Sequence, residues 1–468
     1  MKLRIWQRKC IELAIKKFKS GQKHFLVLAT PGAGKTHMSA TLAKKLINDD
    51  LVDLVLCFSP STLVSIDFKE ALSTQLNAKF DGKIGAAGQS LTYQYMQYLD
   101  DRFWDLFTNF RVLVIFDEIH HCSGSNTSNA NSWGEQIILN IQEKAAYTIA
   151  LTGTPWRSDN MPIALSNYCY KTQKILCDYS YGLKEAITDN VCRMPQIIAI
   201  DNDQISVTKN EEQESFTSFL DLLSQSILPF KEIIENDEVI EQLLTRATKK
   251  LQKIRLINPN AGGLIIASSV NHANQIFSIL KNKLNKHATI VTYKEDMPSD
   301  IIRDYRNSNE EWIISVGMIS EGTNIPRLQV CCHLTNIKTE MHYRQILGRI
   351  LRVTNSPDQT AILYMLAEPK LVEYAYRVNQ DIPEGVDIVQ FEKFDMDFKI
   401  DSKNRNSSNI ILKKSDDIQL EINDFDSLHD NYADIGELKN PLTESYERMV
   451  NIFGRYKEES LRLNIFTL

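Results

Sequence analysis

The stretch HFLVLATPGAGKTHMSATLAKKLI, from His24 to Ile47, indicates the fold of the chain. It begins with an apolar run typical of a buried strand, passes through a glycine-rich turn, and continues into a segment that should be helical. Such a turn presents backbone N–H groups and the positive end of a helix dipole to phosphates. Lys35 would reach the β- and γ-phosphates of a nucleotide, and the Thr36 hydroxyl would ligate Mg²⁺.

Further apolar runs follow this one at regular intervals. DLVLCFS, FRVLVIFDE and YTIALTGT alternate with amphipathic stretches up to about residue 200, and from residue 261 the pattern restarts with GLIIASS, ATIVTY, EWIISVGM, VCCHLT and TAILYML. Near-continuous apolar strands separated by helical stretches are typical of buried parallel sheets. We therefore predict an α/β fold with two tandem parallel-sheet domains, at residues 1–202 and 259–375.

Two segments lie outside these predicted domains. Residues 203–258 are polar and helix-prone, and we predict a helical linker or insertion there, whose basic end is either a solvated surface or a contact for a nucleic-acid strand. The basic residues are Arg246, Lys249, Lys250, Lys253 and Arg255. Residues 376–468 are irregular and acidic, and we predict a C-terminal extension.

The composition limits the class of protein. The chain has 468 residues, of which 43% are apolar and 24% charged, and it has no apolar run long enough for a membrane span. The N-terminus reads as an amphipathic helix and not as a signal peptide. Eight cysteines form no CxxC pair, which favours reduced thiols in the cytoplasm. A net charge of −6 confines any nucleic-acid contact to a local groove.

Two adjacent acids end the strand FRVLVIFDE. Asp117 and Glu118 would lie beside the phosphate loop, because the carboxyl ends of parallel strands meet at one edge of the sheet. Asp117 can hold the Mg²⁺ shell, and Glu118 can polarise an attacking water. A pair of acids at the end of a buried strand is costly unless it coordinates something. These residues predict a nucleoside triphosphatase that uses Mg²⁺.

Two shorter patterns accompany the acids. LTGTPWR ends a third strand, with the hydroxyls of Thr152 and Thr154 placed to contact the acidic motif. Upstream, LRIWQ supplies Arg4 and Gln7, and the amide of Gln7 has the donor and the acceptor that suit an adenine edge. The predicted nucleotide is therefore ATP.

YRQILGRILR, residues 343–352, has two unlike faces when it is drawn as a helix. Gln345, Arg349 and Arg352 share one stripe, while Ile346, Ile350 and Val353 share another. A solvated surface helix is one interpretation of the polar stripe. With a phosphate loop and paired acids ahead of it, we favour the alternative, in which the arginines point across a cleft at the γ-phosphate.

In this order the motifs resemble those of superfamily-two helicases and translocases of the DExH group. LRIWQ resembles the Q motif, ATPGAGKT motif I, SPSTLV motif Ia, LTYQ motif Ib, DEIH motif II and LTGTP motif III. IIASSVNHA, SVGMISEGTNIPRL and YRQILGRILR resemble motifs IV, V and VI. The resemblance covers about residues 1–375, and DEIHH and SEGTNIPRL are most similar to the restriction-subunit and DNA-repair branch. That branch usually has aspartate where this chain has Asn324.

The resemblance implies two RecA-like domains that bind ATP between them, and it implies a role for each matching residue. Nucleotide binding falls to Arg4, Gln7, Thr30, Pro31, Gly32, Ala33, Gly34, Lys35, Thr36, Gly322 and Asn324. Catalysis falls to Lys35, Asp117, Glu118, Gln345, Arg349 and Arg352, with Mg²⁺ on Thr36 and Asp117. Coupling between motifs falls to His120, Thr152 and Thr154. Nucleic-acid contacts fall to Ser59, Pro60, Thr92, Gln94, Ser269 and Thr323.

The expected function is that of an ATP-dependent DNA helicase or translocase. Its expected partner is nucleic acid, with DNA favoured over RNA, and a nuclease or another defence or repair protein is a further expected partner. Alternatives are a motor or regulatory subunit of a restriction or anti-phage complex, an RNA helicase, and an ATP-dependent clamp that does not unwind. Trp133, in the polar stretch SNTSNANSWGEQ, is expected in a flexible loop, although a strand-contacting loop is the alternative.

Overall fold

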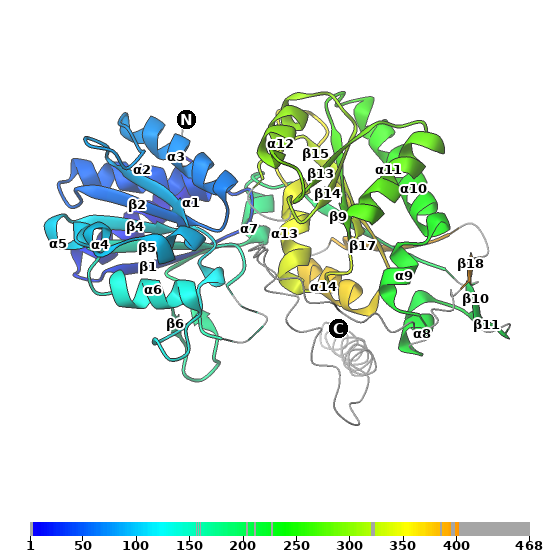
Figure 1. The fold of residues 1–468 in the computed structure, drawn as a ribbon, viewed down its shortest axis with the longest axis horizontal. Coiled ribbons are helices and arrows are strands. Elements are labelled where there is room, and N and C mark those ends of the chain that lie inside the picture. The colour runs from blue at the N-terminus through cyan, green and yellow to red at the C-terminus, as the bar shows by residue number, and fades with distance from the viewer. Residues whose placement is uncertain are drawn as a thin grey trace, which may run out of the picture.

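The computed structural model contains two parallel α/β domains that lie side by side (Figure 1). It describes residues 3–155, 157, 159, 161–202, 205–209, 212–225, 228–319, 323–383, 386–394 and 398–401. Gly322, predicted to bind nucleotide, lies outside the described residues, as does most of the predicted C-terminal extension. Among the described helices, none is long and apolar enough to cross a membrane.

The first domain is built on six parallel strands in the order β3-β2-β4-β5-β1-β8. The strands are β1 His24–Ala29, β2 Leu54–Ser59, β3 Gly88–Thr92, β4 Val112–Phe116, β5 Tyr147–Thr152 and β8 Tyr179–Tyr181. The helices are α1 Ile5–Lys19, α2 Lys35–Asn48, α3 Thr62–Leu76, η1 Tyr93–Tyr98, α4 Asp101–Trp104, α5 Leu106–Asn109, η2 Ile119–His121, α6 Ser132–Asn140 and α7 Leu183–Thr188. A short antiparallel pair consists of β6 Asn167–Tyr168 and β7 Ile175–Leu176.

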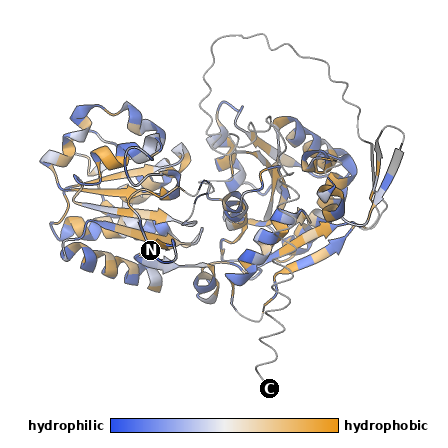
Figure 2. Cartoon of the chain, turned by 90° about the horizontal axis from the view of Figure 1, so that it is seen from below, coloured by the Kyte–Doolittle hydropathy of each residue, from blue (hydrophilic) through white to orange (hydrophobic). Residues whose placement is uncertain are grey.

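The second domain is built on seven parallel strands in the order β13-β14-β12-β15-β16-β9-β17. The strands are β9 Pro195–Asp201, β12 Gly262–Ala267, β13 Ala288–Thr292, β14 Trp312–Val316, β15 Leu328–Leu334, β16 Ala361–Leu366 and β17 Val389–Lys393. The helices are α8 Phe219–Ser224, α9 Phe230–Ile234, α10 Asp237–Arg255, α11 Val270–Asn282, α12 Pro298–Asn307, α13 Glu340–Ile350 and α14 Pro369–Gln380. The strands of both sheets are mostly hydrophobic (Figure 2).

The domain boundary differs from the predicted one. β9, which we expected in the first domain, pairs with β16 and β17 of the second sheet. An apolar strand such as PQIIAID fits either sheet, and only its long-range pairing decides. The chain therefore crosses between the domains before residue 195 and not at residue 202. α14 and β17 likewise carry the second domain beyond residue 375.

The predicted linker is also part of the second domain. α10 buries one apolar face in the core of that domain, and β10 Ile205–Lys209, β11 Glu212–Phe216 and β18 Phe398–Asp401 form a small separate sheet. Arg246 forms an ion pair of 2.9 Å with Glu392, and Arg255 donates to the carbonyl of Ala261 at 2.5 Å. Two of the five basic residues at the end of this segment are therefore engaged within their own domain.

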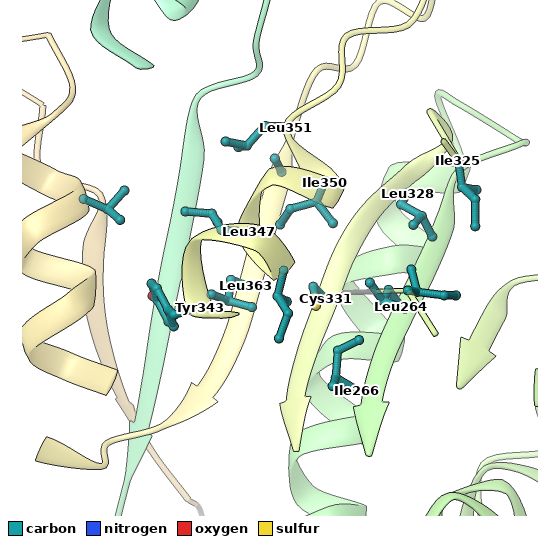
Figure 3. Close-up of a cluster of buried hydrophobic side chains, with 14 of the residues drawn as sticks. Leu264, Ile266, Ile325, Leu328, Cys331, Tyr343, Leu347, Ile350, Leu351 and Leu363 are labelled. Carbon is teal, nitrogen blue, oxygen red and sulfur yellow. The ribbon is translucent and has the colours of Figure 1, made fainter. Parts of the chain in front are cut away.

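α13 packs its apolar side on the second sheet. Tyr343, Leu347 and Ile350 lie against Cys331 and Leu363 (Figure 3), and all five are nearly or fully buried. The neighbouring Cys332 is fully buried in the same core. The helix ends earlier than predicted. Val353, expected to anchor it, lies beyond the helix and is 36% exposed.

Candidate nucleotide site between the two domains

The phosphate loop joins β1 to α2 as the sequence predicts. Gly32 and Gly34 have φ angles of +82° and +94°, in the left-handed region that glycine adopts most readily. Gly34 caps α2, so Lys35 and Thr36 are the first two residues of the helix. Backbone N–H groups and the helix dipole therefore point to one place in front of the loop. Thr30, Pro31 and Ala33 complete this loop.

The N-terminal helix is fastened to the phosphate loop. Arg4 donates from Nη1 to the carbonyl of Ala33 at 2.6 Å, and Gln7 donates from Nε2 to the carbonyl of Gly34 at 2.9 Å. The Oε1 of Gln7 accepts from the backbone N of Arg4 at 2.9 Å. Both residues therefore lie at the predicted site. However, both ends of the Gln7 amide are engaged by the protein, so an adenine contact would have to exchange one of these bonds.

The lysine of the loop and the second acid form an ion pair. Lys35 Nζ lies 2.6 Å from Oε1 of Glu118, whose Oε2 accepts from the backbone N of Gly153 at 3.1 Å. Glu118 has a φ of +49°. Burial raises the pKa of Glu118, but Lys35 and then His120 outweigh burial and hold this pKa below its usual range. Glu118 is therefore an anion, held in place by a cation and a backbone N–H.

Asp117 has the opposite electrostatic environment. Its side chain is buried, and burial first, followed by the adjacent Glu118, raises its pKa above the usual range despite Lys35. The carboxylate is therefore poorly stabilised, and a divalent cation next to it would supply the missing stabilisation. Mg²⁺ takes few protein ligands beside water and phosphate oxygens. Asp117 and Thr36 therefore fit the predicted Mg²⁺ site.

The predicted coupling residues meet in the structure. His120 Nδ1 lies 2.9 Å from Oγ1 of Thr152 and 3.3 Å from Oγ1 of Thr154, and it lies 3.4 Å from Oε2 of Glu118. All three coupling residues are buried. The end of β4 and the end of β5 are thereby connected through one imidazole. In the part of the chain described, no group of three or more His, Cys, Asp or Glu side chains could together hold a metal ion.

The second domain brings α13 to the phosphate loop. A Cβ atom on Gly348 would lie 2.7 Å from Cβ of Pro31, and one on Gly32 would lie 3.2 Å from Cγ of Arg352. The absence of both side chains allows the two domains to meet there (Figure 1). The predicted arginine side of the cleft therefore faces the predicted phosphate site.

The polar stripe of α13 is not solvated. Gln345 and Arg349 are each 8% exposed, and Arg349 donates from Nη1 to the carbonyl of Thr323 at 2.9 Å. Arg352 donates from Nη1 to Oδ1 of Asn324 at 2.5 Å. The interpretation of YRQILGRILR as a solvated surface helix is therefore wrong. Arg352 lies past the end of the helix, in a single antiparallel bridge with Cys192.

Arg193, which follows that bridge, was missed by the sequence analysis. It is 1% exposed, and its backbone N donates to the carbonyl of Leu351 at 2.7 Å. Its guanidinium donates hydrogen bonds of 2.6–3.4 Å to oxygens near the start of β15 and near the end of α13. The acceptors belong to Pro326, Leu328, Ile350, Thr354 and Gln359. The residue at the domain crossing thus holds the C-terminal end of α13 and the start of β15 together.

The predicted nucleic-acid residues divide into two groups. Ser59 and Thr323 are 0% and 2% exposed, so the predicted contacts of these side chains with a strand do not fit the structure. Pro60 is also buried, and its carbonyl accepts from Nε2 of Gln94 at 3.2 Å. Thr92 and Ser269 are half-buried and cap η1 and α11.

Trp133 does not lie in a flexible loop. It is 7% exposed in the first turn of α6, and its ring stacks on that of Tyr93 with the centroids 5.6 Å apart. Tyr93 is fully buried. The polar stretch before Trp133 concealed a helix start that Asn131 caps by accepting from the backbone N of Gly134.

The comparisons with known proteins agree with this arrangement. Residues 1–157 match the family described as "Type III restriction enzyme, res subunit", and residues 246–354 match the "Helicase conserved C-terminal domain". The two parallel-sheet domains, with the phosphate loop and acids on the first and the arginines facing them on the second, have tandem RecA-like folds. The first domain is thus similar to the res subunit of type III restriction enzymes, and the second is similar to the C-terminal domain of superfamily-two helicases.

Several similar proteins support this assignment. A protein of Mycobacterium leprae (strain TN) is 29% identical over 387 residues, which are 80% of this chain and 63% of that protein. The chain thus spans less than two thirds of that relative. The "DNA 3'-5' translocase XPB2" of Sulfurisphaera tokodaii is 22% identical, over 80% of this chain and 83% of that protein. The structure of the "ATP-dependent Type ISP restriction-modification enzyme LlaBIII bound to DNA" has a TM-score of 0.52 at 14% identity, and the match covers 86% of this chain and 32% of that chain.

Proposed function

We propose that the protein is an ATP-dependent DNA helicase or translocase that hydrolyses ATP between its two domains. The observation that carries this proposal is the meeting of Arg352 with Gly32, which brings the guanidinium side of one domain to the phosphate loop of the other. Phosphoryl transfer depends mostly on positioning and on stabilisation of charge. The phosphate loop, which would position the phosphates, and the arginines, which would stabilise their charge, face the same space between the domains.

The residues suggest how hydrolysis would proceed. The γ-phosphate would attract Lys35 Nζ and loosen its 2.6 Å pair with Glu118. Glu118 would then orient a water for attack on the γ-phosphorus and accept a proton from that water. The bond from the γ-phosphorus to the β–γ bridging oxygen would break, and this oxygen would stay on ADP. Arg349 and Arg352 would stabilise the charge on the transferring group. Asp117 and Thr36 would hold Mg²⁺, which would supply positive charge to neutralise the phosphates.

Hydrolysis would be coupled to movement through domain closure. The arginines belong to one domain and the phosphate loop to the other, so the reactive arrangement exists only when the domains are together. Closure and opening of the domains would change the contacts that the segments near Thr92 and Ser269 make with a nucleic-acid strand. Contacts of this kind fall on phosphates, so we expect little sequence preference and strong weakening by salt.

DNA is the favoured track. The named function of the Sulfurisphaera relative supports DNA over RNA for this chain, whereas solved structures of similar fold hold either DNA or RNA. Free thiols at all eight cysteines are compatible with a reducing compartment such as the cytoplasm.

The proposal is tested by ATPase rates measured against single-stranded, duplex, forked and RNA ligands. We expect DNA to raise the rate severalfold or more, and we expect Lys35→Ala to abolish both the basal and the stimulated activity. A wild-type rate that none of the ligands raises would contradict the proposal. A strand-displacement assay on the same ligands separates unwinding from translocation along a duplex.

A second candidate is the motor subunit of a restriction or anti-phage complex in which a separate nuclease cuts. The match of residues 1–157 to the res-subunit family favours it. Purification of the full chain from its native host, followed by a DNA-cleavage assay with ATP, tests this candidate. Cleavage that requires ATP and a co-purified polypeptide would support it, and ATPase activity with no associated cleavage would count against it.

A further inference from the structure

The backbone of Asp117, directly after β4, is hydrogen-bonded by two segments that come earlier in the chain. The backbone N of Asp117 donates to the carbonyl of Phe58 at 2.9 Å, and the carbonyl of Asp117 accepts from the hydroxyl of Tyr93 at 2.7 Å. Phe58 directly precedes motif Ia, and Tyr93 lies inside motif Ib. Both predicted strand-contacting segments therefore hold the acid predicted to bind Mg²⁺.

The Tyr93 hydrogen bond also determines how the neighbouring acid is presented. The carbonyl of Asp117 and the N–H of Glu118 belong to one planar peptide unit, so fixing the first orients the second. Glu118 has a φ of +49°, which a residue with a side chain adopts only where its surroundings hold it. The Tyr93 hydroxyl is one of the groups that hold it.

The two segments are fastened to each other. Ser59 donates from Oγ to the carbonyl of Leu91 at 3.3 Å, and Gln94 donates from Nε2 to the carbonyl of Pro60 at 3.2 Å. Ser59 and Gln94 are two of the residues that we predicted to contact a nucleic-acid strand directly. Because they join the two segments, a strand that displaces one segment will displace the other.

Tyr93 has little freedom to move independently. It is fully buried, and its ring stacks on Trp133 at 5.6 Å with an interplanar angle of 19°. Trp133 in turn meets the ring of His121 edge to face at 6.5 Å, and His121 lies 4.4 Å from the ring of His120. Tyr93 is therefore linked to the acidic motif directly, through its hydroxyl on the Asp117 carbonyl, and indirectly, through the rings of Trp133 and His121.

We propose that Tyr93 is a positioning residue that transmits strand binding at motifs Ia and Ib to the Asp117–Glu118 peptide. Strand binding shifts the joined segments, the Tyr93 hydroxyl shifts with them, and the peptide rotates Glu118 towards its productive position. This inference rests on the proposed strand-stimulated ATPase. It assigns the stimulation to one hydroxyl group.

The test replaces that hydroxyl with hydrogen. In Tyr93→Phe the ring and its stacking stay, while the bond to the Asp117 carbonyl and a weaker contact with the Cys122 thiol are lost. We measure the ATPase rate with and without duplex DNA, the KM for ATP, the affinity for DNA and the melting temperature. We expect the ratio of stimulated to basal rate to fall by about three- to tenfold, the range that one neutral hydrogen bond supports. KM and DNA affinity should change by less than about twofold.

Tyr95→Phe is the matched control. Tyr95 lies two residues further along η1 and is 49% exposed, so the same substitution there should leave the ratio unchanged. If Tyr93→Phe is unstable, Trp133→Phe keeps the hydroxyl but reduces the stacking surface, and it should lower the same ratio by a smaller factor.

Two results would overturn the inference. The first is a stimulation ratio in Tyr93→Phe equal to that of the wild type. The second is an equal fall of the basal and the stimulated rates, which would mean that the hydroxyl only satisfies a buried carbonyl. A wild-type chain that no strand stimulates would instead refute the proposed function, and the inference with it.

Discussion

The charged groups of the two domains that face the predicted nucleotide site have different partners. On the first domain, Lys35 and Glu118 neutralise each other at 2.6 Å. On the second domain, Arg352 donates to the amide oxygen of Asn324, and Arg193 donates to carbonyl, amide and hydroxyl oxygens. Burial first, and Arg349 next, lower the pKa of Arg352 to about 9, and burial lowers the pKa of Arg193 to about 10.

This difference indicates what a triphosphate would change. It would take Lys35 from Glu118 and leave that carboxylate able to orient water. It would also supply the anion that stabilises the guanidinium of Arg352. Neither face holds a complete hydrolytic site by itself, because the lysine and the acid lie on the first domain and the arginines lie on the second.

The largest effect is expected from the arginine face. Arg349→Ala and Arg352→Ala should each lower kcat by about 10³-fold or more, since an arginine finger contributes about 10³ to 10⁵ in rate. Nucleotide binding should persist, because the phosphate loop lies on the other domain. Single-turnover hydrolysis and fluorescent-nucleotide titration measure the two quantities.

Arg344→Ala is the control on the same helix. Arg344 pairs with Glu340 at 2.9 Å and with Asp381 at 2.5 Å, both in its own domain. Its removal should leave kcat within about twofold. Normal hydrolysis by both cleft-arginine variants would show that the polar stripe of α13 has no part in the reaction.

The neutralised face should show a smaller loss. Glu118→Gln removes the proton acceptor and should lower kcat by about 10² to 10⁴. The same change releases Lys35 from its ion pair, so nucleotide affinity should stay equal or rise. A fall in affinity that parallels the fall in kcat would mean that Glu118 organises the loop instead of the attacking water. Equilibrium binding and steady-state kinetics on one preparation separate these outcomes.

The pKa of Asp117 leads to a pH dependence. Because this pKa is raised in the folded state, the stabilising contribution of the protonated carboxyl is lost as the pH rises through the folded-state value. Mg²⁺ competes with that proton. The Mg²⁺ concentration that gives half-maximal ATPase rate should therefore rise by up to about tenfold per pH unit as the pH falls below neutrality. A Mg²⁺ requirement that does not vary with pH would remove Asp117 from the site.

The smallest effect is expected at the domain crossing. Arg193→Lys keeps the charge but cannot reproduce the planar set of donors, so α13 should lose its fixed end and kcat should fall by about tenfold. Arg327→Lys is the control, because Arg327 is also buried and also donates to carbonyls, at Tyr305 and Glu310. If both variants lose the same stability but only Arg193→Lys has a lower kcat, Arg193 positions Arg349 and Arg352. Equal loss of rate would reduce Arg193 to a stabilising residue.

Local patterns predicted much of the first domain. The phosphate loop, the acids and the threonines after β5 each belong to one strand end, and parallel pairing brings such ends to a common edge. The loop geometry and the His120 cluster are therefore as expected from the sequence. The apolar face of α13 was also found from helical spacing.

Features that depend on distant pairing could not be predicted in this way. β9 reads as a generic apolar strand, and only hydrogen bonds with β16 and β17 place it in the second sheet. The sequence around Arg193 does not indicate the role of this residue, because its partners are mostly backbone carbonyls more than 130 residues away. The strand contact predicted for Ser59 came from the resemblance of SPSTLV to motif Ia. A small polar residue at a strand end is equally suited to an internal bond, and Ser59 donates to the carbonyl of Leu91.

We expect Arg349 of the second domain to contribute to the stability of the transition state and not to the affinity for the ground-state nucleotide. The most direct test compares the affinity of ADP–aluminium fluoride with that of ADP, in the wild type and in Arg349→Ala. We predict that the wild type binds the transition-state analogue at least about 10²-fold more tightly than ADP. We predict that Arg349→Ala loses most of this preference while its affinity for ADP is unchanged. An undiminished preference in the variant would contradict the account.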